Sequence, residues 1–302
     1  MDRKEKILRH INKNGTGIEI GPSYNPIAPK KEGYNVHIID HLSKEELLAK
    51  YKDFHVDLKK IEEVDFIWKG EKYVDLIGKK KYYDWIIASH LIEHTPDLID
   101  FFSNCDEILK DNGIISLAIP DKRYCFDHFR PITGISKIID HHYQKIDKHT
   151  VGTVAEFYLN VVSKAKNIAW DPFTNGEYAL VHSLDETKQK INTLIEENKY
   201  MDLHSWCFTP NSFRLIINDL NLLGLISFKE IEFYPTEGCE FFVTLGKDAK
   251  GVETPRLELL KMIEDEICDE TYRHTKIQKN KKNLPEQPGI FQRFLKKIRK
   301  CR

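Results

Sequence analysis

Short apolar runs that alternate with amphipathic stretches dominate the first 121 residues. The apolar runs at 18–20, 35–39, 64–68, 84–89 and 114–120 predict five buried strands. Helical periodicity occupies residues 2–13, 43–51 and 95–109. Ser43 with Glu46 predicts a capping box, Thr95-Pro96 a helix start, and Asn112-Gly113 a turn into the fifth strand. Strands that alternate with helices at this spacing predict a parallel sheet covered by helices.

The regular pattern stops at residue 122 and returns near residue 201. Residues 122–200 are too long for an ordinary connection, so we interpret them as a partly helical insertion lying as a lid over the carboxyl edge of the sheet. Thr209-Pro210 then predicts another helix start, and two strands at 226–234 and 240–245 form a hairpin through Gly238. The predicted fold is α/β: a doubly wound, mainly parallel seven-stranded sheet with a C-terminal antiparallel hairpin and an inserted helical lid.

This pattern divides the chain into four parts. Residues 1–121 are the predicted cofactor-binding part, 122–200 the inserted acceptor-binding or lid region, and 201–250 the completion of the sheet. Residues 251–302 contain a charged helix, a linker and a basic tail.

Composition narrows the class of protein. A hydrophobic content of 41% and a charged content of 31% are typical of a soluble globular protein. The net charge of -1 gives no reason to expect nucleic acid as a partner. Six scattered cysteines without a C-x-x-C pair indicate reduced thiols rather than a disulfide framework or a zinc site. No signal-peptide or membrane-spanning pattern is present in the sequence, so we expect a cytoplasmic protein.

The tail at 289–302 changes this expectation in one respect. GIFQRFLKKIRKCR places apolar residues on one helical face and only basic charges among the others. That pattern predicts a helix that attaches peripherally to an anionic membrane surface, at the inner membrane face. A solvated charged tail or a docking helix for a partner protein are the alternatives.

Two acids at neighbouring strand ends are the first candidates for a ligand site. Glu19 lies in the first strand, directly before a sharp turn at Gly21, and Asp40 ends the second strand about twenty residues on. An acid in the position of Asp40 can accept hydrogen bonds from both hydroxyls of a ribose. A dinucleotide site needs G-x-G-x-x-G, which this turn lacks, so a nicotinamide dehydrogenase is disfavoured.

Several motifs together resemble one family. EIGPSYNP, the acid in IIDH, YDWIIASHLIEHTPD and EILKDNGIISLAIPDKRYCFD are similar to motifs of the class I S-adenosylmethionine-dependent methyltransferases. Within that superfamily they resemble bacterial methyltransferases found with cell-surface polysaccharide synthesis. The familiar first motif is acid-x-Gly-x-Gly-x-Gly; this chain keeps Glu19 and Gly21 but has Ser23 and Asn25 at the next two glycine positions. The resemblance covers residues 15–121 and, to a lesser extent, 204–245.

The resemblance implies S-adenosylmethionine as cofactor and assigns residues to it. Glu19, through the turn of Gly21 and Ser23, would face the amino group of the cofactor, and Asp40 would hold the ribose. Glu71 falls where the family contacts adenine. Ser89 and Leu91 end the fourth strand, where the sulfonium should lie.

Methyl transfer to a hydroxyl also requires a general base. The candidate bases are His90 and His94 at the end of the fourth strand, with His128, His141, His142 and His204 as further candidates. Asp121 at the end of the fifth strand and Asp127 after it could orient a base or an acceptor hydroxyl. Asp140, His141 and His142 could also coordinate a divalent metal, but adjacent residues on a helix diverge by about 100 degrees, so both histidines rarely serve one ion and we assign no metal ligand.

The expected function is therefore O-methylation of a sugar or sugar-phosphate group in cell-surface polysaccharide biosynthesis, with a glycan acceptor and glycosyltransferases as partners. One alternative is a methyltransferase of a small metabolite, at oxygen or nitrogen. The other is a methyltransferase-fold scaffold without activity.

Overall fold

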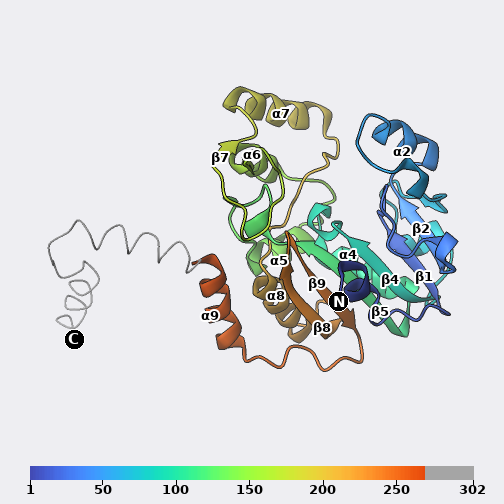
Figure 1. Ribbon diagram of the computed structural model, residues 1–302. Coiled ribbons are helices and arrows are strands. Elements are labelled where there is room, and N and C mark those ends of the chain that lie inside the picture. Colours follow the sequence, from blue (N-terminus) through green and yellow to red (C-terminus); the bar gives the residue numbers. More distant parts are fainter. Residues whose placement is uncertain (269–302) are drawn as a thin grey trace, which may run out of the picture. The chain divides into compact units, whose positions relative to one another are not determined.

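Seven strands form one sheet in the order β3-β2-β1-β4-β5-β9-β8 (Figure 1). The computed structural model describes residues 1–268. β1 to β5 pair in parallel, whereas β9 is antiparallel to both β5 and β8. The strands are β1 Thr16–Ile20, β2 Asn35–Asp40, β3 Phe66–Ile67, β4 Tyr83–Ser89, β5 Leu109–Pro120, β8 Lys229–Glu237 and β9 Glu240–Gly246. The mainly parallel seven-stranded sheet and its C-terminal hairpin are therefore confirmed.

Helices connect and cover the strands. They are α1 Arg3–Leu8, α2 Lys44–Tyr51, α3 Tyr73–Ile77, α4 Leu98–Ile108, α5 Ile135–Tyr143, α6 Val151–Asn160, α7 Leu184–Glu197, α8 Pro210–Leu222 and α9 Arg256–Ile267. Among the described residues, no helix is long and apolar enough to cross a membrane. The predicted membrane-binding tail at 289–302 lies outside the described residues.

The central strand β4 buries both of its faces, which explains its nearly continuous apolar sequence. Trp85 and Ile87 pack on one side in a core with Ile7 of α1. Ile86 and Ala88 pack on the other side, in a larger core that contains the apolar faces of α4 and α8. Alternate side chains of a strand point to opposite faces, so this pattern fixes the register of β4 in the sheet.

Two of the predicted helix starts are confirmed and one is wrong. Ser43 caps α2 with the reciprocal Glu46 contact, and Pro210 is the first residue of α8. α4, however, begins at Leu98 with Asp97 as its N-cap, whose side chain accepts from the amide of Asp100 at 3.0 Å. The Thr95 hydroxyl instead donates to the carbonyl of Ile92, at the end of a short 3-10 turn.

The predicted turn at Asn112-Gly113 is also absent from the described fold. β5 already begins at Leu109, and its pairing with β4 shifts register between Tyr83 and Trp85. Tyr83 pairs with Leu109 but Trp85 pairs with Ile114, so the Asn-Gly pair is accommodated in an irregularity of a continuous strand.

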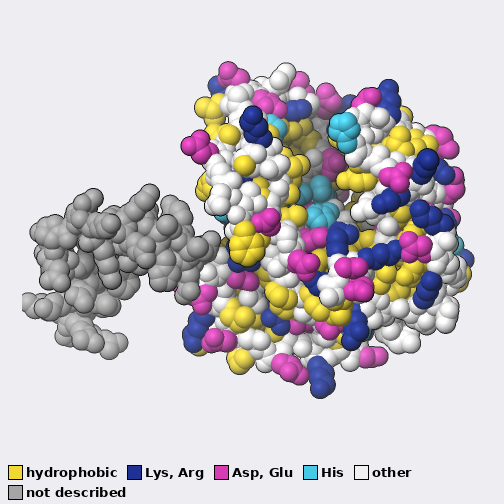
Figure 2. Space-filling view, in the orientation of Figure 1, with side chains coloured by type: hydrophobic (Ala, Val, Ile, Leu, Met, Phe, Trp, Pro, Cys, Tyr) yellow, Lys and Arg dark blue, Asp and Glu magenta, His cyan; other side chains and the backbone are white. Residues whose placement is uncertain are grey.

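The insertion contains α5, α6, α7 and a small antiparallel pair, β6 Val162–Lys164 with β7 Tyr178–Leu180. α6 and α7 lie on one side of a hollow and α2 lies on the other (Figures 1 and 2). Histidine side chains are visible on the floor of this hollow (Figure 2). The boundaries that we assigned to the insertion stay a prediction.

Candidate active site

The turn after β1 lies against the carboxyl end of β2. Gly21 has a φ of +66°, which only glycine adopts without strain, and its amide donates to the carbonyl of Ile39 at 2.8 Å. The Asp40 carboxylate accepts from the amide of Ser23 at 3.1 Å. The structure thus brings together Gly21, Ser23 and Asp40, which the sequence placed at the cofactor.

Glu19 has a supporting position in the structure. Its buried carboxylate accepts from the amides of Ile27 and Ala28 at 2.7 and 3.1 Å, and so holds the loop that follows the turn. Burial raises the pKa of Glu19 to about 7, although the two amide hydrogen bonds lower it. Direct contact between Glu19 and the amino group of the cofactor stays a prediction.

We expect Gly21→Ala to weaken the cofactor turn more than backbone strain alone explains. Gly78, the C-cap of α3, has a similar φ of +69°, so alanine carries the same penalty of about 1 kcal/mol at both positions. At Gly21 the added methyl would also meet the Leu91 side chain at 2.9 Å, whereas at Gly78 it meets nothing within 4 Å. Calorimetry should show weaker binding of S-adenosylhomocysteine for Gly21→Ala and unchanged binding for Gly78→Ala. Equal effects of the two variants would contradict this account.

The remaining residues predicted for the cofactor occupy three different environments. The Glu71 carboxylate accepts from the amide of Lys69 at 2.8 Å, which closes the loop after β3. Ser89 is the last residue of β4, and its hydroxyl accepts from Arg3 of α1 at 2.8 Å. Leu91 contacts the Gly21 turn. Contact of these three residues with the cofactor stays a prediction.

His90 is held by a charged pair. It has a φ of +51°, and its Nε2 lies 2.8 Å from Oε2 of Glu240, which also accepts from Arg3. Burial opposes charge on both partners, but their hydrogen bond outweighs it: the pKa of Glu240 falls to about 2, and that of His90 rises. A histidine whose positive charge is stabilised in this way is a poor general base, so the geometry argues against that prediction for His90.

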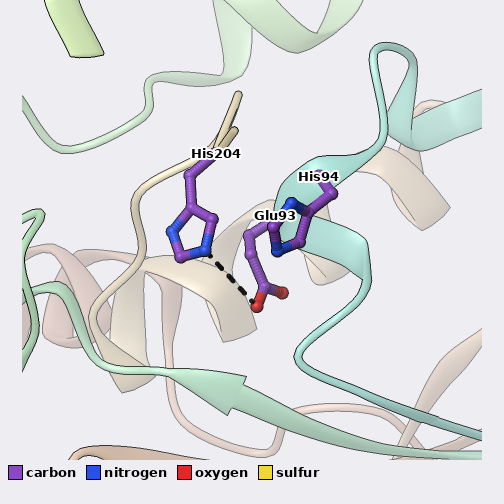
Figure 3. Close-up of side chains that lie close together, drawn as sticks. All are labelled: Glu93, His94 and His204. Atoms are coloured by element: carbon purple, nitrogen blue, oxygen red, sulfur yellow. Dashed lines mark ion pairs between the residues drawn. The ribbon is translucent and has the colours of Figure 1, made fainter. Parts of the chain in front are cut away.

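Glu93, His94 and His204 converge at the end of β4 (Figure 3). Each offers a ligand atom, and these atoms lie within 4.8 Å of one another. Glu93 is fully buried, and neither of its carboxylate oxygens has a hydrogen-bond partner. One oxygen lies 3.9 Å from Nε2 of His204 and 3.8 Å from Nδ1 of His90. A buried carboxylate is costly unless it is paired, so this position indicates a function.

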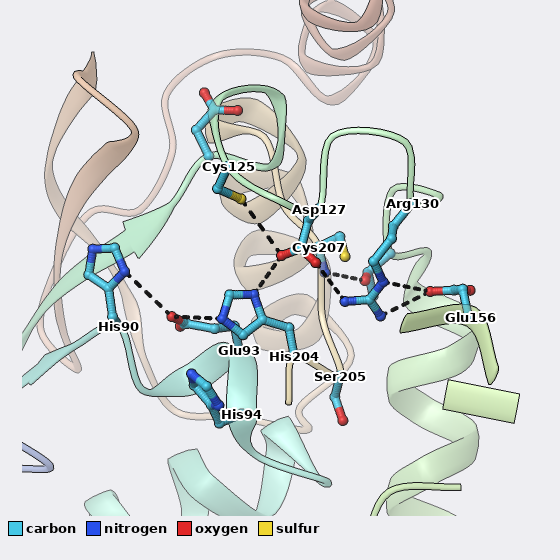
Figure 4. A network of polar contacts seen from close by, with 12 residues as sticks. His90, Glu93, His94, Cys125, Asp127, Arg130, Glu156, His204, Ser205 and Cys207 are labelled. Atoms are coloured by element: carbon cyan, nitrogen blue, oxygen red, sulfur yellow. Dashed lines mark hydrogen bonds and ion pairs between the residues drawn. The ribbon is translucent and has the colours of Figure 1, made fainter. Parts of the chain in front are cut away.

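A chain of ion pairs leads from this cluster into the insertion (Figure 4). Nδ1 of His204 lies 2.5 Å from Asp127, and Asp127 accepts from Arg130 at 2.8 Å. Arg130 in turn contacts Glu156 of α6 at 3.0 Å. Burial opposes the charge of Asp127, but His204 and Arg130 outweigh it and lower its pKa to about 2. Asp127 therefore orients the His204 ring with Nε2 toward Glu93.

His94 has a similar support. Its Nδ1 lies 2.9 Å from Asp202, and its ring packs edge-on against that of His204 with centroids 4.6 Å apart. The half-exposed Tyr200 donates to the backbone carbonyl of His94. The prediction that His94 belongs to the reacting end of the site is compatible with this position.

Asp121, predicted to orient a base or an acceptor hydroxyl, contacts Arg123 and Thr236 in the structure. Its carboxylate is fully buried, where it pairs with Arg123 at 2.5 Å and accepts from the Thr236 hydroxyl at 2.5 Å. Asp121 also caps the short helical turn that follows β5. These contacts give it a structural role at the start of the insertion.

The other candidate histidines have partners outside the cluster. His128 contacts the carbonyl of Arg123, and His141 contacts the carbonyl of Pro96. His142 pairs with Asp97 at 2.9 Å. His141 and His142 thus have separate partners, as expected for adjacent positions on a helix.

Sequence reasoning missed Glu93, Asp202 and Glu240, although it named Asp127, which contacts His204, as an acid that could orient a base. The sequence does offer a signal for Glu93, because it is an acid within SHLIEH at the end of a predicted buried strand. Asp202 also stands two residues before His204. Glu240 gives no comparable signal, because only the antiparallel pairing of β9 with β5 brings it to the site.

Comparison with protein families decides the class. Residues 1–148 match the family model described as a methyltransferase domain. Residues 1–148 therefore form a methyltransferase domain, which spans just under half of the chain. The chain is a methyltransferase enzyme, and S-adenosylmethionine is its cofactor. No curated protein matches the chain.

Solved structures similar to this methyltransferase are remote. One, from Rhodobacter sphaeroides and named for Zn-dependent alcohol dehydrogenases, has a TM-score of 0.43 at 13% identity and covers 82% of this chain and 89% of its own. Another, from Methanosarcina mazei and named for SAM-dependent methyltransferases, has a TM-score of 0.37 at 12% identity, covering 81% and 97%. Likenesses at this level say nothing about the activity of this methyltransferase.

Two polar groups that can bind the cofactor lie at the carboxyl ends of β1 and β2 in this methyltransferase. The Ser23 hydroxyl is buried without a hydrogen-bond partner beside the Asp40 carboxylate. A nucleoside with ribose hydroxyls can satisfy an orphaned hydroxyl and a carboxylate at once. Asp40 and Ser23 are thus the residues that would hold the ribose.

Proposed function

We propose that this methyltransferase methylates a hydroxyl oxygen of a sugar or sugar-phosphate acceptor in cell-surface polysaccharide biosynthesis. The observation that carries the proposal is the group of Glu93, His94 and His204, which lies at the end of β4 beside the cofactor turn. S-adenosylmethionine supplies an electrophilic methyl group on a sulfonium. The chain must then align an acceptor oxygen and remove its proton.

His204 is the group best placed to take that proton. Asp127 holds its Nδ1, so that Nε2 points to Glu93 in the floor of the site. As the acceptor oxygen gains the methyl group, its hydrogen leaves as a proton to Nε2, and the electron pair of the broken carbon–sulfur bond stays on sulfur. Asp127 stabilises the imidazolium that forms.

The surroundings favour a polar, hydroxyl-rich acceptor. Tyr200, with 47% of its surface exposed, lies beside His94, where an aromatic face can pack against a sugar ring. A nitrogen acceptor with a free lone pair has less need for a buried group of bases. A small metabolite that carries a hydroxyl is the second candidate, because the same cluster serves it equally well.

An acceptor panel tests this function. The enzyme is incubated with S-adenosylmethionine and nucleotide sugars, lipid-linked saccharides, small hydroxy compounds or amines, and products are identified by mass spectrometry. We expect a methyl ether on a sugar hydroxyl and an equal amount of S-adenosylhomocysteine. Methylation of amines in preference to every hydroxyl acceptor would contradict the proposal.

A further inference from the structure

In the cluster of Glu93, His94 and His204, the Glu93 carboxylate lacks hydrogen bonds, which a role in accepting a proton does not explain. The distances from the Glu93 oxygen to the rings of His90 and His204 are 3.8 and 3.9 Å, which are too long for hydrogen bonds. Both oxygens of Glu93 lack a hydrogen-bond partner although the side chain is fully buried. A ligand that binds to both a carboxylate and an imidazole would give the Glu93 oxygens the partner that they lack.

We propose that Glu93, His94 and His204 bind a divalent transition-metal ion. Two imidazoles and one carboxylate are a ligand set of catalytic zinc and non-haem iron sites, which leave further coordination positions open. An ion bound at about 2.1 Å from each ligand in tetrahedral geometry places the ligand atoms about 3.4 Å from one another. The ligand atoms lie within 4.8 Å of one another, so the most distant pair would have to approach by up to about 1.4 Å on binding.

The second ring nitrogens support this assignment. His204 contacts Asp127 through Nδ1, which leaves its Nε2, 3.9 Å from Glu93, for the ion. Nδ1 of His94 lies 2.9 Å from Asp202. Metal-binding histidines nearly always present their second nitrogen to a carboxylate or carbonyl, because this fixes the ring and raises its basicity. His90, whose Nδ1 lies 3.8 Å from Glu93, is paired with Glu240 and is not part of the proposed ligand set.

The local charge points the same way. Glu93, Asp127 and Asp202 all face the two histidine rings, and the guanidinium of Arg130 is shared between Asp127 and Glu156. Glu93 and Asp127 are buried whereas Asp202 is largely exposed, and a divalent cation would offset the negative charge of the buried pair. A bridging water would satisfy hydrogen bonds but would leave the charge uncompensated.

This inference rests on the proposed function for its purpose and deepens it. An ion with open positions beside the methyl-transfer site can bind a hydroxyl oxygen of the acceptor and lower the pKa of that hydroxyl. His204 would then hold the ion, and the proton of the ion-bound hydroxyl would pass to solvent water instead of to Nε2 of His204. The favoured acceptor is therefore one with oxygen ligands to offer, such as a sugar.

The test measures metal binding without acceptor or cofactor. The full-length protein is stripped with a chelator and titrated with Co²⁺, whose visible absorption reports ligand type, and with Zn²⁺ by calorimetry. We expect saturable binding of one ion by the wild type, loss of the Co²⁺ spectrum in Glu93→Gln, and about 10–100-fold weaker binding in Asp127→Asn. His142→Gln, which changes a histidine paired with Asp97 outside the cluster, should bind as the wild type does.

Three outcomes would overturn the site. They are the absence of Co²⁺ and Zn²⁺ binding by the wild type, an unchanged Co²⁺ spectrum in Glu93→Gln, or a loss of binding in His142→Gln alone. The wild-type titration tests the site even where a variant fails to fold. S-adenosylhomocysteine binding is measured on the same wild-type sample: its loss would count against the proposed function, whereas its presence without metal binding would count against the metal site only.

Discussion

Replacing Glu93 with glutamine should lower kcat/KM for methyl transfer at least about 100-fold and leave S-adenosylhomocysteine affinity unchanged. The reason is geometric, because Glu93 belongs to the histidine group that follows β4, whereas the predicted ribose residues Ser23 and Asp40 contact each other at the ends of β1 and β2. The substitution keeps the size of the side chain and removes only its charge. The measurement is steady-state methyl transfer, with calorimetry for S-adenosylhomocysteine.

Stability gives this prediction a second readout. A fully buried carboxylate without hydrogen bonds costs folding free energy, and a neutral amide costs less. In chelator at pH 8, the free energy of unfolding of Glu93→Gln should therefore equal or exceed that of the wild type by about 1 kcal/mol. His142→Gln is the matched control for both measurements. A variant that loses stability and activity together would indicate a structural role for Glu93.

The sequence predicted those elements of the fold whose signal lies within a few neighbouring residues. The alternation of strands and helices, the Ser43 cap and the start of α8 follow from periodicity and capping chemistry within a few residues, and these were confirmed. The start of α4 was misplaced because Thr95-Pro96 has the composition of a helix start, whereas Asp97 provides the cap that the backbone uses. Local composition cannot decide between two adjacent caps.

The residues of the candidate site also differ in whether their signal in the sequence is local. Gly21 and Asp40 were predictable because a strand end fixes where the next residues lie. The environment of each candidate base depends instead on partners that are distant in the chain. Glu240 pairs with His90, 150 residues away in sequence, and Asp127 contacts His204, 77 residues away. Such pairs are set by tertiary packing, so no sequence pattern separated a structural histidine from a reactive one.

Asp40→Ala should weaken S-adenosylhomocysteine binding by about 100-fold, the second large effect. A carboxylate that accepts from two ribose hydroxyls contributes about 1.5–3 kcal/mol per charged hydrogen bond, and each 1.4 kcal/mol is tenfold in affinity. The variant also releases the Ser23 amide, which loosens the turn. Asp53→Ala, at an exposed position after α2, is the matched control and should bind normally.

The two variants together separate the halves of the site. Asp40→Ala should lose cofactor affinity but keep Co²⁺ binding, while Glu93→Gln should do the reverse. Because Asp40 ends β2 and the Glu93 group follows β4, with β1 between them, neither substitution removes a contact of the other. If Asp40→Ala bound S-adenosylhomocysteine as tightly as the wild type, the ribose would have to lie elsewhere, and the buried hydroxyl of Ser23 would need another partner.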